Sequence, residues 1–216
     1  MPAEGPVAQP RGGPLGVRPS GDGHAGRLRR AGGVRKRTLG VVTDLRLRPA
    51  RTSDVPAIKD LVAPLARAGV LINKDTVAYY EGIQEFLVVE AVGDEQAGLV
   101  GCGALHVMWE DLGEVRTLAT SDEWRGRGVG RTLLAGLIER ARAVGVSRVF
   151  CLTFEVDFFS RHGFAVMPNQ NQVHPDVFAE LLRSHDEGVA EYLDLARVKP
   201  NTLGNTRMLL ELSPED

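Results

Sequence analysis

One short run of the chain combines glycines with arginines, residue types that together favour phosphate binding. It is Arg125-Gly126-Arg127-Gly128-Val129-Gly130, and it lies between an apolar segment at 115–120 and a segment at 133–144 whose apolar residues recur at helical spacing. Glycines leave the amide N–H groups of a loop uncovered, and a helix N-terminus adds partial positive charge. The arginines supply charge-assisted contacts. The run therefore predicts a site for the phosphate or pyrophosphate of a cofactor.

Two common phosphate-binding motifs do not fit this run. A Walker-type loop requires Lys after its last glycine, whereas Gly130 is followed by Arg131. A dinucleotide fingerprint requires glycines at its first, third and sixth positions, and counting from Gly126 the sixth position is Arg131. The pattern that fits is Arg-x-x-Gly-x-Gly, formed by Arg125, Gly128 and Gly130.

This pattern resembles the acyl-coenzyme A loop of the GNAT acetyltransferases. The resemblance runs from Leu45 to the C-terminus and also includes Arg48-Pro49-Ala50-Arg51-Thr52-Ser53-Asp54, a central hairpin and Phe158-Phe159-Ser160-Arg161-His162-Gly163-Phe164. It implies an α/β (α+β) fold with a mixed, mostly antiparallel sheet, splayed parallel strands four and five, and helices on both faces.

The resemblance also implies that acetyl-CoA, as co-substrate, lies in the gap between these two strands. The freed backbone of Leu118, Ala119 and Thr120 is then expected to pair with the pantetheine arm. The pyrophosphate is expected to meet the cofactor loop, which consists of Arg125, Gly126, Arg127, Gly128, Val129, Gly130, Arg131 and Thr132.

Acetyl transfer to an amine requires a neutral amine, stabilisation of the developing oxyanion and a proton for the departing thiolate. Glu114 opens strand four and is our candidate for the base that deprotonates the amine, directly or through a water molecule. A backbone N–H at Leu118 or Ala119 is the candidate oxyanion donor. The sequence does not clearly indicate the acid that protonates the thiolate, because Phe158 and Phe159 occupy the stretch where many members of the family carry a Tyr. Ser160 is the nearby hydroxyl, and water is the alternative.

Within the family, the runs 114–119 and 197–208 resemble a short, stand-alone branch of the N-acetylglutamate synthases. That resemblance implies acetylation of the α-amino group of an amino acid, with L-glutamate as the first candidate acceptor, L-glutamine as the second, and arginine biosynthesis as the pathway. An acceptor with two carboxylates requires cations and amides in its pocket. The candidate cations are Arg116, Lys199 and Arg207, and Asn201 or Asn205 is the candidate to hold a side-chain amide or carboxylate. The alternatives are acetylation of a protein N-terminus, a lysine or an antibiotic amine, and a non-catalytic acetyl-CoA sensor.

The elements that must position these residues follow from periodicity and from glycine and cap signals. Strands are expected at 45–49, 86–92, 99–109, 114–120, 148–153 and 206–212. Helices are expected after an N-cap at Ser53 and at 73–83, 128–144, 157–162, 175–184 and 187–195. The strand–helix–strand unit at 114–153 predicts a parallel pair joined by a right-handed crossover.

The first forty residues differ in composition from the rest of the chain. Residues 1–40 contain ten Gly and five Pro and carry a net charge of +6, whereas the whole chain carries −2. A segment so poor in apolar residues cannot bury enough surface to offset its ordering entropy. We therefore predict a disordered tail at 1–43 and one GNAT domain at 44–216.

The composition also indicates which partners and which cellular location are expected. The chain contains neither an apolar run long enough to span a membrane nor the apolar core of a signal peptide, which predicts a cytoplasmic protein without membrane contact. The basic tail lacks aromatic residues, so nucleic acid is not an expected partner. No His, Cys, Asp or Glu group has metal-ligand spacing, and none is required, so no metal is expected. A homodimer is compatible with the sequence, which does not determine the oligomeric state.

Overall fold

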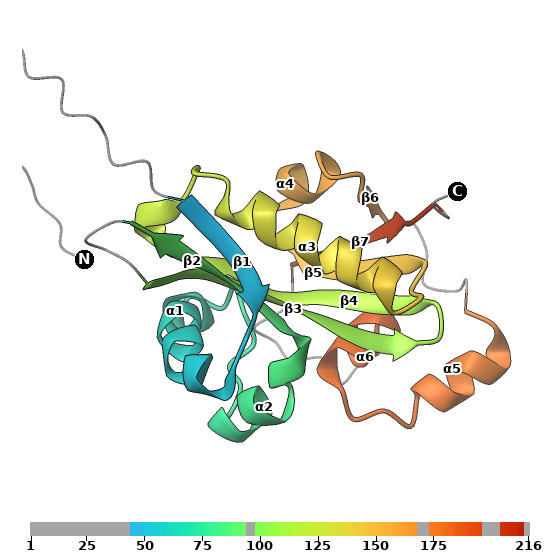
Figure 1. Ribbon diagram of the computed structural model, residues 1–216. Coiled ribbons are helices and arrows are strands. Elements are labelled where there is room, and N and C mark those ends of the chain that lie inside the picture. Colours follow the sequence, from blue (N-terminus) through green and yellow to red (C-terminus); the bar gives the residue numbers. More distant parts are fainter. Residues whose placement is uncertain (1–43, 94–97, 168–172, 196–203, 214–216) are drawn as a thin grey trace, which may run out of the picture. The chain divides into compact units, whose positions relative to one another are not determined.

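The computed structural model describes residues 44–93, 98–167, 173–195 and 204–213. Within them, seven strands form one sheet in the order β1-β2-β3-β4-β5-β7-β6 (Figure 1). The strands are β1 (Asp44–Pro49), β2 (Phe86–Val92), β3 (Gly98–Trp109), β4 (Leu112–Thr120), β5 (Arg148–Thr153), β6 (Ala165–Val166) and β7 (Thr206–Glu211). All neighbours pair antiparallel except β4 and β5, which are parallel. The expected mixed, mostly antiparallel sheet is confirmed.

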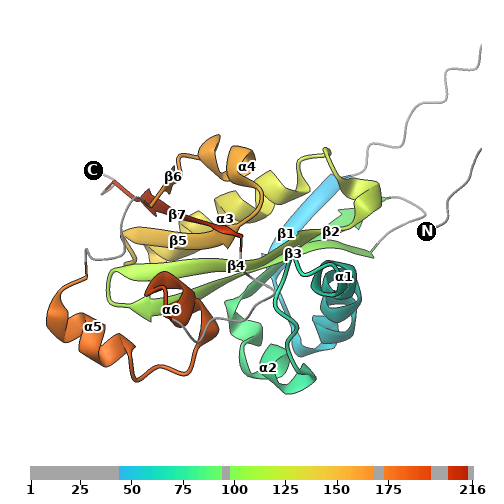
Figure 2. The same cartoon turned by 180° about the vertical axis from the view of Figure 1, so that it is seen from behind.

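Helices cover both faces of the sheet (Figures 1 and 2). The α-helices are α1 (Val55–Arg67), α2 (Thr76–Glu81), α3 (Val129–Ala143), α4 (Val156–Ser160), α5 (Pro175–Leu181) and α6 (Glu187–Tyr192). Three 3-10 turns, η1 (Thr52–Asp54), η2 (Ile83–Glu85) and η3 (Asp122–Trp124), complete the described elements. Helix α3 packs on one face, and α1, α2 and α6 pack on the other.

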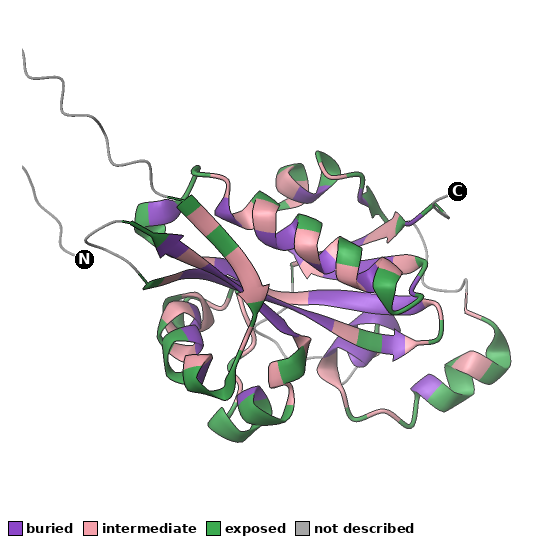
Figure 3. Cartoon of the chain, viewed as in Figure 1, coloured by how far each residue is buried: buried purple, intermediate pink, exposed green. Residues whose placement is uncertain are grey.

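The core divides according to these two faces. On the α3 face, Leu133, Leu134, Leu137 and Ala141 are buried, as their helical spacing predicted, and they pack against inward side chains of β2 to β5 (Figure 3). On the opposite face one cluster forms under α1 and α2, and a second forms around Phe150 and α6. The residues of β4 alternate between these faces, so that Val115 joins the α3 core while Glu114 and Arg116 point to the other side.

The parallel pair separates soon after it begins. Strands β4 and β5 pair only over Leu112–Glu114 and Arg148–Phe150. The expected splayed pair is therefore present, and the β5-facing edge of β4 has no strand partner beyond Glu114.

A bulge in β4 changes the direction of the backbone just beyond this point. Cys102 pairs with Ala119 and Ala104 pairs with Arg116, so two residues, Thr117 and Leu118, lie opposite Gly103. Thr117 adopts φ 55°, a left-handed conformation that is costly for a β-branched residue.

Several local expectations were wrong. The strand expected at 114–120 begins at Leu112, so Glu114 is its third residue, and the helix expected at 73–83 spans only Thr76–Glu81. Helix α1 begins at Val55 with Asp54 as its N-cap, because the 3-10 turn η1 contains Ser53. The helices expected at 175–184 and 187–195 end earlier, at Leu181 and Tyr192. Strand β6 was not expected at all, because its two residues form a strand only by pairing with β7. The tail expected at 1–43 lies outside the described residues and stays a prediction.

Candidate active site

The cofactor loop has the backbone shape that its glycines predicted. Gly126 and Gly128 adopt φ values of 74° and 88°, in the region that glycine enters without strain. A side chain built on Gly126 would meet no other atom within 4 Å, so the space above the loop is open. Gly128 is the N-cap of α3, and with 15 residues α3 is the longest helix of the described chain. Unpaired N–H groups at the start of this helix therefore face a space that can admit a pyrophosphate.

The loop arginines are exposed and have local partners. The Arg125 Nε atom lies 2.9 Å from Asp122 Oδ1, an ion pair that is weak because both side chains are largely in solvent. The Arg127 guanidinium lies 4.9 Å from the centre of the Trp124 ring, a cation–π arrangement. These contacts hold the two arginines at the loop, and their remaining N–H groups stay available to an anion.

The free edge of β4 can bind the pantetheine arm of acetyl-CoA. Leu118, Ala119 and Thr120 lie beyond the last pair between β4 and β5, so their backbone groups on that side have no strand partner. An extended chain with amide groups, such as pantetheine, can bind to such an edge as an added strand does. The free edge at 118–120 and the cofactor loop at 125–132 therefore stay our candidates for binding acetyl-CoA, which supplies the activated acetyl group when it is bound.

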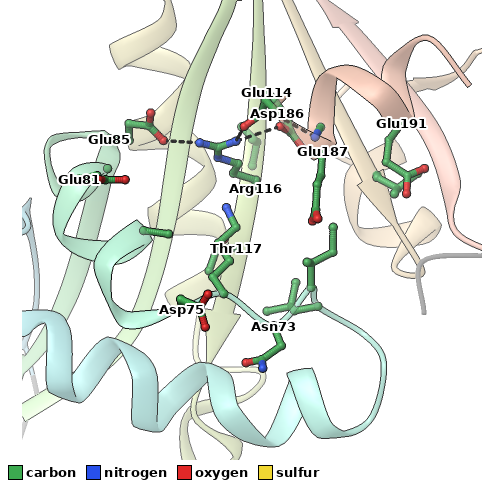
Figure 4. Close-up of a pocket in the computed structure, with 18 of the residues that line it drawn as sticks. Asn73, Asp75, Glu81, Glu85, Glu114, Arg116, Thr117, Asp186, Glu187 and Glu191 are labelled. Carbon is green, nitrogen blue, oxygen red and sulfur yellow. Dashed lines mark hydrogen bonds and ion pairs between the residues drawn. The ribbon is translucent and has the colours of Figure 1, made fainter. Parts of the chain in front are cut away.

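A pocket of about 550 Å³ adjoins this surface on the α2 and α6 side of the sheet (Figure 4). Its walls come from the segment before α2, from η2, from β4 and from the start of α6. Val115, Arg116 and Thr117 of β4 line it together with Glu114, and the edge expected to bind pantetheine begins at the next residue. The pocket is therefore placed to bring an acceptor beside the acetyl donor.

Glu114 lies at this junction and is buried, with 6% of its surface exposed. Its Oε2 atom accepts no hydrogen bond, and the nearest cation is the Arg116 Nη1 atom at 3.7 Å. Burial raises the pKa of Glu114 from 4.5 to about 7, an effect that Arg116, Lys74 and His106 oppose and Asp186 reinforces. A carboxylate with a pKa close to neutral is well matched to accept a proton from an ammonium group.

Arg116 is in the pocket, as an acceptor ligand should be, but protein carboxylates bind its guanidinium (Figure 4). Its Nη1 atom donates to Asp186 Oδ2 at 2.7 Å, and its Nη2 atom donates to Glu85 Oε2 at 2.8 Å. Burial by itself lowers the pKa of Arg116, but Glu114, Asp186 and Glu85 raise it overall. The positive charge of Arg116 is thus largely neutralised by the protein itself.

Lys74 is a pocket residue that sequence reasoning missed. It lines the pocket from the segment before α2, and no carboxylate of the described residues forms an ion pair with it. Burial lowers its pKa, and the neighbouring Arg116 lowers it further. Nothing in the local sequence distinguishes Lys74 from a surface lysine, because its position in the pocket depends on how α2 packs. It is a cation that a substrate carboxylate can bind.

Of the other predicted residues, Asn205 lines the pocket. The remaining ones lie away from it or outside the described chain. Ser160 is exposed at the end of α4 and does not line the pocket. Arg207 lies on β7, opposite the pocket residue Leu152, with its Nη1 atom 3.5 Å from Asp194 Oδ1. Lys199 and Asn201 lie outside the described residues.

Metal clusters and membrane-spanning helices are both absent from the described ranges. These ranges contain no group of three or more His, Cys, Asp or Glu residues that could hold a metal ion. No helix in the same ranges is long and apolar enough to cross a membrane.

Comparison with known proteins agrees with the fold and with acetyl-CoA as the co-substrate. Residues 62–164 match the acetyltransferase (GNAT) family. The chain is 52% identical over 166 residues to an amino-acid acetyltransferase of Mycobacterium tuberculosis, an alignment that covers 77% of this chain and 94% of the relative. The chain therefore belongs to the GNAT acetyltransferase family, and it takes its acetyl group from acetyl-CoA.

Two solved structures of other proteins are similar to this chain. Rv2747 from M. tuberculosis, in complex with CoA and NLQ, has a TM-score of 0.73 and 51% identity, covering 78% of this chain and 99% of that one. N-acetylglutamate synthase from Neisseria gonorrhoeae, complexed with coenzyme A and N-acetyl-glutamate, has a TM-score of 0.62 and 26% identity. That alignment covers 79% of this chain but only 35% of the N. gonorrhoeae chain, so the similarity is confined to about a third of that protein.

Proposed function

We propose that this protein transfers the acetyl group of acetyl-CoA to the α-amino group of a free amino acid, with L-glutamate as the acceptor and arginine biosynthesis as the pathway. The observation that supports this most is Glu114, a buried carboxylate without a hydrogen-bond partner on Oε2, located where the pocket meets the free edge of β4. The relatives named as amino-acid acetyltransferases support the acceptor class.

In this proposal Glu114 removes a proton from the acceptor ammonium, which makes the amine nucleophilic. A backbone N–H at Leu118 or Ala119 stabilises the developing oxyanion, because the bulge at Thr117 redirects the backbone there. Solvent supplies the proton for the departing thiolate, since Ser160 is exposed and lies outside the pocket lining. Residues 125–132 hold the pyrophosphate.

Lys74 binds the carboxylate of the acceptor. We do not assign this role to Arg116, because its hydrogen bonds to Glu85 and Asp186 already neutralise its charge. Charge–charge attraction in a half-enclosed pocket then places the acceptor with its ammonium towards Glu114 and its carboxylate towards the segment before α2.

L-Glutamine is the second candidate, and the charge of the pocket favours it. Two cations, Lys74 and Arg116, line the pocket within the described residues, against seven carboxylates: Asp75, Glu81, Glu85, Glu114, Asp186, Glu187 and Glu191. A second carboxylate on the acceptor is repelled by such a lining, whereas a side-chain amide is not.

A CoA-release assay across the twenty amino acids, with mass spectrometry of the products, tests both candidates. We expect glutamate or glutamine to raise CoA release well above the hydrolysis of acetyl-CoA alone and to yield the N-acetyl amino acid. Growth without arginine, in a bacterial strain that lacks its own N-acetylglutamate synthase, tests the pathway. If peptide amines stimulate release and no free amino acid does, the proposal is wrong. Tight acetyl-CoA binding without any turnover favours a sensor instead.

A further inference from the structure

The first turn of α6 lies directly on the carboxyl group of Glu114. A Cβ atom built on Gly188 would overlap Glu114 Oε2 and lie 2.6 Å from Glu114 Cδ, so either α6 or the carboxyl group would have to move. Gly188 is itself buried. The α6 backbone therefore approaches the carboxylate closely only because residue 188 has no side chain, and it excludes water from that side of Glu114.

Asp186 holds this turn in position with both of its carboxylate oxygens. Oδ1 accepts hydrogen bonds from the backbone N–H groups of Gly188 at 2.8 Å and Val189 at 3.2 Å, which caps α6. Oδ2 accepts a hydrogen bond from Arg116 Nη1 at 2.7 Å. Arg116 thereby ties the start of α6 to β4, two residues from Glu114.

The same arginine reaches the opposite wall of the pocket. Its Nη2 atom donates to Glu85 of η2 at 2.8 Å, and the other oxygen of Glu85 lies 2.8 Å from His106 Nδ1. Figure 4 shows Arg116 between Glu85 on one side and Asp186 and Glu114 on the other. One guanidinium thus connects the α2 side of the pocket with its α6 side.

We propose that Arg116, Asp186 and Gly188 are positioning residues that hold α6 over Glu114 and set how readily this carboxylate takes up a proton. The inference rests on the proposed function, in which Glu114 is the base. Arg116 acts through Glu114 and α6 in this arrangement, and it does not bind the acceptor.

Charged and titratable groups face Glu114 from every surrounding element: Lys74 before α2, Glu85 of η2, His106 of β3, Arg116 of β4, Cys151 of β5, and Asp186 and Glu191 at α6. Two of these residues can be replaced by neutral amides, and the two have opposite effects on the Glu114 pKa. Arg116 lowers the pKa of Glu114 and Asp186 raises it. Replacing each residue by its neutral amide should therefore move the Glu114 pKa in opposite directions.

The test measures Glu114 directly by ¹³C NMR of glutamate carboxyl groups in the full chain, with the signal assigned by its loss in Glu114→Gln. We expect the Glu114 pKa to rise by about one pH unit in Arg116→Gln and to fall in Asp186→Asn. Gly188→Ala should lower it as well, because lifting α6 admits water. The matched controls are Gly98→Ala, where an added Cβ would meet no atom within 4 Å, and Arg46→Gln, at an exposed position of β1. Thermal unfolding verifies that each variant folds.

A pH profile of kcat/KM provides the second measurement. Arg116→Gln should move the acidic limb of the profile to higher pH and reduce kcat/KM about tenfold at pH 6. Arg116→Lys should restore part of this loss. An unchanged Glu114 pKa in all three variants overturns the inference, whatever the activity. If the NMR pKa moves as expected but the pH profile does not follow, the inference about α6 stands and Glu114 is not the base.

Discussion

Glu114→Gln should stabilise the protein increasingly as the pH rises. The Glu114 pKa is about 7 in the folded protein, because of burial, and near 4.5 when unfolded. Between these values the folded protein holds a proton that the unfolded chain has released, so the free energy of unfolding falls as pH rises through this window. At 1.36 kcal/mol per pH unit, the loss reaches about 3 kcal/mol above pH 7. Glutamine has the same shape and cannot ionise, so it avoids this loss.

Urea unfolding followed by tryptophan fluorescence, at intervals from pH 4.5 to 8, measures the difference between the two proteins. We expect the free energy of unfolding of Glu114→Gln, relative to the parent, to increase by about 3 kcal/mol across that range. Any constant cost of burying the amide cancels in this comparison. Glu123→Gln, at an exposed position in η3, is the matched control. A difference that is constant with pH, or that grows towards acid pH, refutes the argument that burial raises the Glu114 pKa.

The same variant separates stability from chemistry. Its kcat should fall about a hundredfold or more at pH 7, while its affinity for acetyl-CoA stays the same, because Glu114 faces the pocket and not the cofactor loop. Near-normal kcat in Glu114→Gln means that another group or solvent accepts the proton.

Three further predictions concern the cofactor loop, the pocket and the tail. Gly128→Ala should weaken acetyl-CoA binding at least tenfold, as measured by calorimetry. The control is Gly145→Ala, because Gly145 has the same φ of 88° at the far end of α3; it should lower the stability by a similar amount and leave acetyl-CoA binding unchanged. Equal affinities in the two variants contradict the assigned loop. Lys74→Met should raise the KM of the acceptor about tenfold or more without changing the Kd of acetyl-CoA. Lys59→Met on α1 is the control. An unchanged KM rules out Lys74 as the partner of the acceptor carboxylate. Removal of residues 1–43 should leave kcat and acetyl-CoA affinity unchanged, and a large rise in KM or a loss of solubility would argue that the tail has a function.

The backbone of the cofactor loop and of α3 was predictable from the sequence because it depends on local structure. Gly128 must adopt a left-handed conformation to start α3, and the apolar spacing of Leu133, Leu134 and Leu137 already indicated which helix follows. The order of strand, loop and helix then predicted the parallel pair of β4 and β5. Glu114 was also selected from the sequence as the candidate base, because it stands near the start of the strand that precedes that loop.

The acceptor half depended on contacts between residues far apart in the chain. Arg116 was expected to bind a substrate carboxylate, and its partners are instead Glu85 and Asp186, 31 and 70 residues away. Gly188 carried no signal in the sequence, since its importance comes from a carboxylate on another element. Helix formation and the conformation of tight turns depend on near neighbours and leave patterns in the sequence. Desolvation and ion pairing act through space, so the raised pKa of Glu114 and the engagement of Arg116 were decided only when α2, β4 and α6 packed together.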